Sequence, residues 1–164
     1  MSTNESAFWR FSVEFYAQPG VPDACLTLQD RHGVDVNVLL FLLYLAYRGR
    51  SVQINDVRGI DQHVHAWREQ VIKPLRTLRR NLKGGIAPVA VEASDTLRSA
   101  IKREELHAER LQQEALEHQL PWTSTGAPEI THSAAKTNLL AYETITGKLP
   151  EAVLGTLLRS LPSQ

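Results

Sequence analysis

The sequence predicts an all-α fold: a single-domain bundle of about six or seven helices around a buried central helix at residues 36–47. Apolar residues recur at helical spacing along most of the chain, and no stretch alternates apolar and polar residues as a half-buried strand does. Ten consecutive apolar residues, from Val38 to Tyr47, leave the central helix without a polar face, so the other helices must surround it. With 164 residues and 43% hydrophobic content, the chain can form one core without disulfides or a structural metal.

Turn and cap residues mark the first helices. Residues 2–5 (Ser-Thr-Asn-Glu) have the spacing of a capping box, and the run that follows places three phenylalanines on one side of a helix. Pro22 suits the first turn of a second helix, which ends near His32 with Gly33 in the left-handed cap position. Asp35 is then expected to cap the central helix.

The middle of the chain is expected to hold a long helix. Residues 51–59 are polar and are predicted to be a connection, after which apolar residues follow one another at spacings of three and four over residues 64–82. Pro74 removes a backbone donor inside this pattern, so the sequence predicts a kink or a break there. Gly84 and Gly85 are expected to end the helix.

A further helix is predicted to run from a cap at Ser94 to Pro121, after a linker over residues 86–93. Residues at alternating spacings of four and three form a seam on it like that of a coiled coil. The predicted seam consists of Leu97, Ile101, Glu104, Ala108, Leu111, Ala115 and His118. Such a seam packs either inside the domain or against a second copy of the chain.

The last part of the chain is predicted to hold a loop rich in Thr, Gly and Pro and then two shorter helices, over about residues 131–146 and 150–160. Residues 1–164 as a whole are predicted to form one domain. The alternative is a division into a main bundle, a joining loop and a C-terminal helical hairpin, over residues 1–119, 121–130 and 131–160.

Opposite charges cancel over the whole chain but not segment by segment. Eighteen Lys and Arg balance 18 Asp and Glu, yet residues 1–35 carry −3, residues 48–83 carry +6, residues 92–117 carry −3 and residues 118–164 carry zero. Five cations of the positive segment fall on one arc of a helix and form a basic stripe. The basic stripe consists of Lys73, Arg76, Arg79, Arg80 and Lys83.

Two interpretations of the basic stripe stay open. Clustered Arg and Lys bind the phosphates of a nucleic acid or of a phosphorylated ligand. Alternatively, the stripe is an ordinary solvated helix face, and the acidic helix at residues 95–117 supplies partners for it within the molecule. The second interpretation is favoured because no aromatic residue interrupts the stripe to stack on a base and because the pI is about 7.0.

A polar cluster lies between the second helix and the central helix. Asp30, His32, Asp35 and Asn37 are candidate catalytic residues, with His32 as a base and an Asp that fixes its tautomer. Helix capping explains most of the same residues, because His32 and Gly33 suit a helix end and Asp35 suits a helix start. Asn37 has no such explanation, and it is expected to bind backbone amides or an outside partner.

Two Glu-x-x-His pairs are candidate metal ligands, Glu104 with His107 and Glu129 with His132. They do not alternate with single Glu residues as a di-iron bundle requires, and a chain with 12 Glu produces such pairs by chance. No metal site and no cofactor is therefore expected. Cys25, the single cysteine, has no flanking motif and is expected to be a small buried hydrophobe.

Several stretches of the sequence resemble a proteobacterial family of short conserved hypothetical proteins, all-helical and classed as a domain of unknown function. These stretches are FWxF at 8–11, YAQPGV at 16–21, ACLxLQDRHGxDVNxLLF at 24–41, WR at 67–68 with Val71, PLRxLRRxLK at 74–83 and ELxAE at 105–109. The resemblance covers residues 6–117. It implies a helical, cytosolic protein, and it brings no activity, cofactor or site residue with it.

These observations favour a non-enzymatic protein-interaction or adaptor module that presents the helices at residues 61–83 and 95–119 to a protein partner or to a second copy. A nucleic-acid or phosphate-ligand binder using the basic stripe is one alternative, and a small enzyme using the polar cluster is another. The single cysteine and the lack of a signal-peptide pattern at the N-terminus predict a cytoplasmic protein. Ten apolar residues are too few for a membrane span, so no membrane association is expected.

Overall fold

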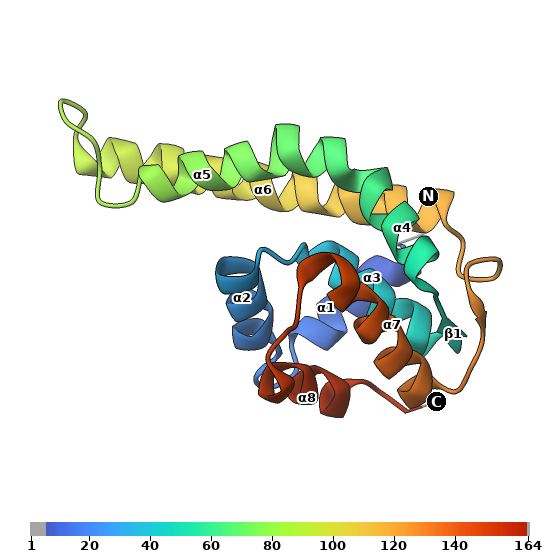
Figure 1. The fold of residues 1–164 in the computed structure, drawn as a ribbon. Coiled ribbons are helices and arrows are strands. Elements are labelled where there is room, and N and C mark those ends of the chain that lie inside the picture. Colours follow the sequence, from blue (N-terminus) through green and yellow to red (C-terminus); the bar gives the residue numbers. More distant parts are fainter. Residues whose placement is uncertain (1–5, 164) are drawn as a thin grey trace.

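The computed structural model describes residues 6–163, which form a helical bundle around α3 (Val36–Tyr47) (Figure 1). Every residue from Asn37 to Ala46 is buried, as the unbroken apolar run requires. The helix packs most extensively against α7 (Thr131–Thr146), and it also contacts α1 (Ala7–Tyr16) and α6 (Val91–Gln119). The prediction of an all-α bundle around a central apolar helix is confirmed.

The caps predicted for the first helices form, with one difference. The Ser6 side chain accepts a hydrogen bond from the Trp9 N–H and caps α1, whereas the capping box predicted at residues 2–5 lies outside the described residues. Helix α2 (Val21–His32) ends at Gly33, which adopts the left-handed conformation with φ of 63°. One carboxylate oxygen of Asp35 accepts from two N–H groups in the first turn of α3.

The connection predicted over residues 51–59 is wrong, because a short strand ends at its first residue and a helix begins within it. Strand β1 (Arg50–Ser51) pairs antiparallel with β2 (Ala127–Pro128), and α4 (Ile54–Trp67) follows directly. The Asp56 carboxylate accepts a hydrogen bond from the Gln53 N–H at 2.9 Å, which satisfies a backbone donor at the helix start. The polar residues that suggested a connection therefore form the capped first turn of a helix.

The kink or break predicted at Pro74 takes the form of a change in helix type just before it, and the chain stays helical through the proline. Between α4 and α5 (Lys73–Asn81) lies a π-helical turn, η1 (Arg68–Ile72), in which the Lys73 N–H bonds to the Arg68 carbonyl five residues back. The wider turn changes the hydrogen-bond register just before the proline. Pro74 then occupies the first turn of α5, where a missing N–H is tolerated.

Helix α6 begins earlier and faces its neighbours differently than predicted. It starts at Val91, so Ser94 is a buried residue inside the helix rather than its cap. Of the predicted seam, Leu97, Glu104, Leu111 and His118 are exposed. The buried residues are Ser94, Ile101, Glu105, Ala108, Gln112, Gln113 and Leu116. Four of these are polar, and three of the four, Glu105, Gln112 and Gln113, bond to polar or charged side chains of other elements.

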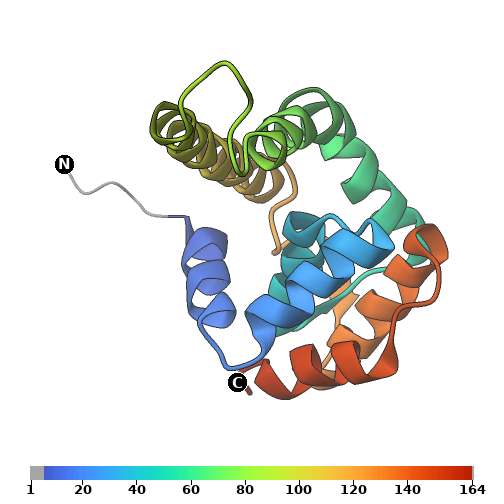
Figure 2. The ribbon, with the colours of Figure 1, turned by 90° about the vertical axis from the view of Figure 1, so that its left-hand side faces the viewer.

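A helical hairpin projects from the bundle. Helices α5 and α6 run antiparallel, and their connected ends extend beyond α2 in Figure 1 and are seen end-on in Figure 2. We call residues 73–103 the arm; they comprise α5, the connecting loop and the first part of α6. Helix α5 buries none of its residues and packs mainly against α6 and η1.

The C-terminal helices are confirmed close to their predicted bounds, as α7 and α8 (Glu151–Ser160). Helix α7 lies along α3 and shares its hydrophobic core, and α8 packs mainly against α2. Within residues 6–163, no helix combines the length and the apolar character that crossing a membrane requires.

Asn138 of α7 connects three segments through its fully buried amide. Its Oδ1 accepts from the Val52 N–H at 2.7 Å, and its Nδ2 donates to the carbonyls of Leu42 at 2.9 Å and Arg50 at 3.1 Å. The amide therefore holds the end of β1 against both α3 and α7.

Replacing this amide is expected to destabilise the fold. Asn138→Ala leaves the buried Val52 N–H without a partner and removes the bonds to the carbonyls of Leu42 and Arg50, so we expect the free energy of unfolding to fall by about 2–4 kcal/mol in urea denaturation. Asn81→Ala, at the exposed end of α5, serves as the control and is expected to change it by less than about 0.5 kcal/mol. Equal effects of the two substitutions would contradict the role assigned to Asn138.

Candidate functional site

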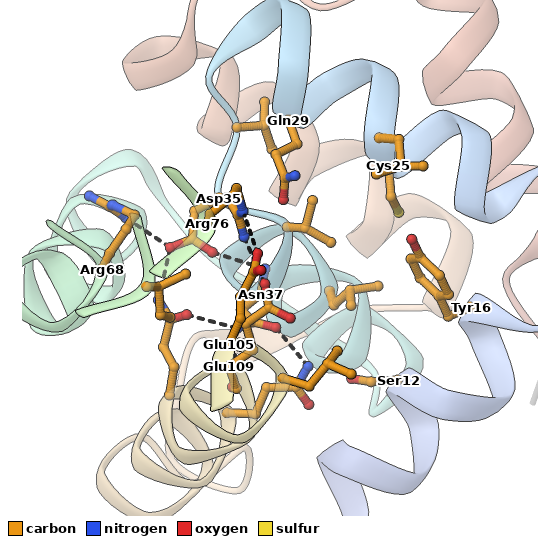
Figure 3. Close-up of a pocket in the computed structure, with 18 of the residues that line it drawn as sticks. Ser12, Tyr16, Cys25, Gln29, Asp35, Asn37, Arg68, Arg76, Glu105 and Glu109 are labelled. Atoms are coloured by element: carbon orange, nitrogen blue, oxygen red, sulfur yellow. Dashed lines mark hydrogen bonds and ion pairs between the residues drawn. The ribbon is translucent and has the colours of Figure 1, made fainter. Parts of the chain in front are cut away.

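A cavity of about 760 Å³ lies where α1, the α2–α3 junction and the paired helices of the arm's base meet (Figure 3). Apolar side chains form much of its wall, among them Trp9, Leu26, Leu40 and Ile72. Its size is within the range of small-molecule sites. The polar groups of the cavity come from residues far apart in the sequence.

Asp35 is the first of these polar groups, and its carboxylate has two tasks. One oxygen caps α3 by accepting from the N–H groups of Asn37 at 2.9 Å and Val38 at 3.2 Å. The other accepts from Arg68 Nη1 at 3.1 Å and from Gln112 Nε2 at 2.8 Å. The carboxylate is therefore satisfied although its side chain is almost fully buried.

Three buried amide side chains continue from this carboxylate, and we call them the amide relay: Gln112, Asn37 and Gln113. Asn37 Nδ2 donates to Gln112 Oε1 at 2.7 Å and to the Glu109 carbonyl at 3.1 Å. Gln113 Nε2 donates to Asn37 Oδ1 at 2.8 Å. The relay thus joins the first turn of α3 to α6 at the floor of the cavity.

Arg68 holds the other side of Asp35. The π-helical turn carries it, and its guanidinium also bonds to Asp61 at 2.7 Å. Burial alone would lower the pKa of Arg68, but hydrogen bonds and charge from Asp61 and Asp35 outweigh it and raise that pKa. Arg68 is therefore a permanent cation between Asp35 and Asp61, and its Nε also pairs with Glu69 at 3.3 Å.

A second group of ion pairs forms the wall nearest the arm. Arg76 Nε donates to Glu105 at 2.9 Å and its Nη2 to Glu109 at 2.7 Å, while Arg79 donates to both oxygens of Glu105. Burial raises the pKa of Glu105, but the hydrogen bonds from Arg79 and Arg76 lower it below its ordinary value. Burial keeps the pKa of Glu109 above its ordinary value, because Arg76 offsets only part of the cost of burial.

The structure divides the basic stripe between several partners. Arg76 and Arg79 meet Glu105 of α6, which is the intramolecular pairing that the acidic helix suggested. Arg80 pairs with Asp30, and the hydrogen bond from Arg80 lowers the pKa of that carboxyl. The two lysines of the stripe, at its ends, are exposed, and the first of them pairs with Glu69 at 2.7 Å.

The four candidate catalytic residues are split by the fold. Asp35 and Asn37 line the cavity, whereas the exposed Asp30 and the half-buried His32, at the end of α2, do not line it. His32 lies in the last turn of α2, next to the Gly33 cap. The structure therefore does not bring a histidine to the carboxylate of Asp35 in the cavity.

The candidate metal ligands lie apart as well. Glu104 and His107 pair with each other at 3.5 Å on the exposed side of α6. Glu129 precedes α7 and bonds to Ser133, which lowers the pKa of its carboxyl, and His132 is exposed. In the part of the chain from residue 6 to 163, no three His, Cys, Asp or Glu side chains gather as metal ligands would.

Cys25 lines the cavity as an apolar group. It is buried, and burial raises the pKa of its thiol to about 12. A thiol with that pKa stays protonated at neutral pH and is a poor nucleophile. Figure 3 shows Cys25 on the same side of the cavity as Tyr16.

A family described as "Protein of unknown function (DUF2390)" matches residues 7–116, which is more than half of the chain. The chain belongs to this family. The resemblance expected over residues 6–117 is confirmed, and every residue that lines the cavity lies within the matched region. Searches of curated proteins and of solved structures gave no match. The family description assigns no activity, so the function has to be argued from the geometry.

Sequence reasoning missed several residues of the site. Arg68, Gln112 and Gln113 were not singled out, because the bonds that bring them into the site, to Asp35 and Asn37, span at least 30 residues along the chain. One available signal was the spacing of polar residues on α6: Glu105 and Gln112 lie seven residues apart and so fall on one face of a helix. The spacing of apolar residues alone predicted instead that the face of α6 with Leu97 and Leu111 is buried.

Removing the charge of Glu105 is expected to weaken the fold in a pH-dependent way. At pH 7, Glu105→Gln should lower the free energy of unfolding by about 1.5–3 kcal/mol, because two arginines lose a buried anionic partner. The folded-state pKa of Glu105 is lowered, so its contribution is complete above the unfolded pKa of roughly 4.3 and is lost as the pH falls through the folded pKa. The difference between variant and wild type should therefore shrink on acidification.

Urea denaturation at pH 7 and at the lowest pH of cooperative unfolding measures this difference. The neighbouring Glu104→Gln is the matched control, because Glu104 is exposed and contacts only His107. We expect it to change the stability by less than about 0.5 kcal/mol at either pH. A pH-independent effect of Glu105→Gln would contradict the ionic role of Glu105.

Proposed function

We propose that this protein is a non-enzymatic interaction module that docks onto the acidic surface of a partner protein through the arm. The observation that carries the proposal is a set of exposed apolar side chains along the arm, whose helix α5 packs mainly against α6 and η1. These side chains are between 47% and 56% exposed and belong to Leu78, Ile86, Val89, Val91 and Leu97. Grouped apolar side chains on a projecting element are typical of protein interfaces.

The charge of the arm supports an acidic partner. Residues 73–103 contain eight Lys and Arg but two Asp and Glu, so the arm carries +6 while the rest of the chain carries −6. Four of the eight cations have no carboxylate within ion-pair distance among residues 6–163. These four are Lys83, Arg98, Lys102 and Arg103. Complementary charge would speed association and orient the partner.

A different protein suits this surface better than a nucleic acid or a second copy. The arm contains no aromatic residue on which a base could stack, and its exposed aliphatic groups gain nothing from a phosphate backbone. Two arms packed against each other would bring together two charges of +6. An arm packed on the body of a second copy is a heterologous contact, which has to close into a ring or continue as a filament.

Cross-linking from the arm tests the proposal. A photo-reactive phenylalanine analogue at Leu97, in the cells that make the protein, is expected to give an adduct with another protein that nuclease does not remove. The same analogue at Leu140, an exposed leucine of α7, is the control and is expected to give no such adduct. The captured protein is then identified, purified and inspected for an acidic surface.

Charge reversal on the arm provides the quantitative measurement. For the purified partner, the Lys83→Glu/Arg103→Glu variant should bind at least tenfold more weakly, and wild-type binding should weaken as salt rises. The thermal midpoint should stay unchanged, because both side chains are exposed. A nuclease-sensitive adduct, an adduct of two copies of the chain, or no adduct from Leu97 would each overturn the proposal.

A further inference from the structure

The amide relay has one fixed direction, which determines the chemistry at its end. The ionised carboxylate of Asp35 can only accept, so Gln112 must turn its NH₂ group toward it and its oxygen toward Asn37. Asn37 must therefore donate to Gln112, which leaves its oxygen to accept from Gln113. The orientation of each amide follows from the one before it.

The relay ends in an acceptor that has no donor. Gln113 uses its NH₂ group on Asn37, and its Oε1 is buried without any hydrogen-bond partner. The hydroxyl of Ser12 on α1 is likewise buried and unpartnered. Gln113 is 3% exposed and Ser12 is 4% exposed, and both residues line the cavity. Two other buried hydroxyls, of Tyr44 and Ser94, also lack a partner, but neither residue lines the cavity. Buried polar groups are nearly always satisfied, so a donor and an acceptor left unpartnered beside one cavity point to a ligand that bonds to both.

The groups around the cavity favour a neutral molecule. Every carboxylate that lines the cavity is paired with an arginine, Asp35 with Arg68, Glu105 with Arg76 and Arg79, and Glu109 with Arg76, so a cationic ligand would have to compete with these pairs. Lys102 also lines the cavity and has no carboxylate partner among residues 6–163, but an anion has no hydrogen to donate to Gln113 Oε1. The walls are mainly aliphatic and aromatic, and Cys25 adds a neutral thiol.

We propose that the cavity binds a small neutral molecule with a flat apolar body and an amide- or lactam-type edge. The N–H of that edge donates to Gln113 Oε1, and its carbonyl accepts from the Ser12 hydroxyl. Both orphan groups are then satisfied, while the apolar body fills the space beside Trp9 and Leu40. This site is separate from the docking surface of the arm, so either proposal can fail without the other.

Three matched probes test this chemistry: 2-naphthamide, methyl 2-naphthoate and 2-naphthoate. They share one apolar body, but the amide both donates and accepts, the ester only accepts, and the carboxylate is charged. In ¹H–¹⁵N NMR titrations of the full chain, 2-naphthamide should shift the side-chain amide of Gln113 and the indole N–H of Trp9. The indole of Trp122, which lies under Arg48 away from the cavity, is the internal control.

The order of affinities is the quantitative prediction. The amide should bind about fivefold to tenfold more tightly than the ester, since one hydrogen bond to a buried acceptor separates them, and more tightly than the carboxylate, which likewise has no hydrogen to donate. Gln113→Met removes the acceptor and should bring the amide-to-ester ratio close to one. Ser12→Ala removes only the hydroxyl and should weaken both probes alike, leaving the ratio unchanged.

Controls separate these effects from a loss of folding. Gln119→Met, at the exposed end of the same helix, should leave all three affinities unchanged. Ser12→Ala removes a group that makes no hydrogen bond, so it keeps the test valid if Gln113→Met unfolds the protein. Equal binding of amide and ester to the wild type, shifts confined to residues outside the cavity, or no saturable binding up to the solubility limit of the probes would each overturn the proposal.

Discussion

The burial of α3 on all sides is the constraint on which the rest of the fold depends. A helix without a polar face can be covered only by the apolar faces of other helices, and α1, α6 and α7 supply them. Apolar contact alone leaves the rotation and height of such a helix weakly specified. Two buried amides supply the missing specificity: Asn37 ties the start of α3 to α6, and Asn138 ties its later turns to α7 and β1.

Asp35 links this constraint to the cavity. The same carboxylate caps α3, accepts from Arg68 of the π-helical turn and orients Gln112. The position of α3, the register of the helix that enters the arm and the polarity of the cavity floor therefore depend on one side chain. The free acceptor at Gln113 therefore does not depend on the orientation of that side chain alone. Exchanging the positions of its oxygen and nitrogen would require the same exchange in every amide before it.

Local signals predicted the features that local interactions create. The Gly33 cap, the Asp35 cap and the apolar run of α3 were readable because each involves residues close together in the sequence. The buried face of α6 was not readable, because Glu105 and Gln112 are buried by partners on other helices while Leu97 and Leu111 stay exposed. The same distance in sequence explains why Asp35 and Asn37 were identified as candidates without the partners that give them a role.

The charge of the arm follows from how α5 and α6 align. Antiparallel pairing places Arg76 and Arg79, near the base of the arm, beside Glu105 and Glu109 in the middle of α6. The first part of α6 is itself basic beyond Asp95, so the arm contains cations on both helices, and its two acids, Glu92 and Asp95, both lie at the start of α6. The charges of the sequence segments did not show this, because the segment over residues 92–117 combines the basic first part of α6 with its acidic later part. In space, the neutral total of the chain separates into a cationic arm and an anionic body, and this separation is what makes one end of the molecule suited to an acidic partner.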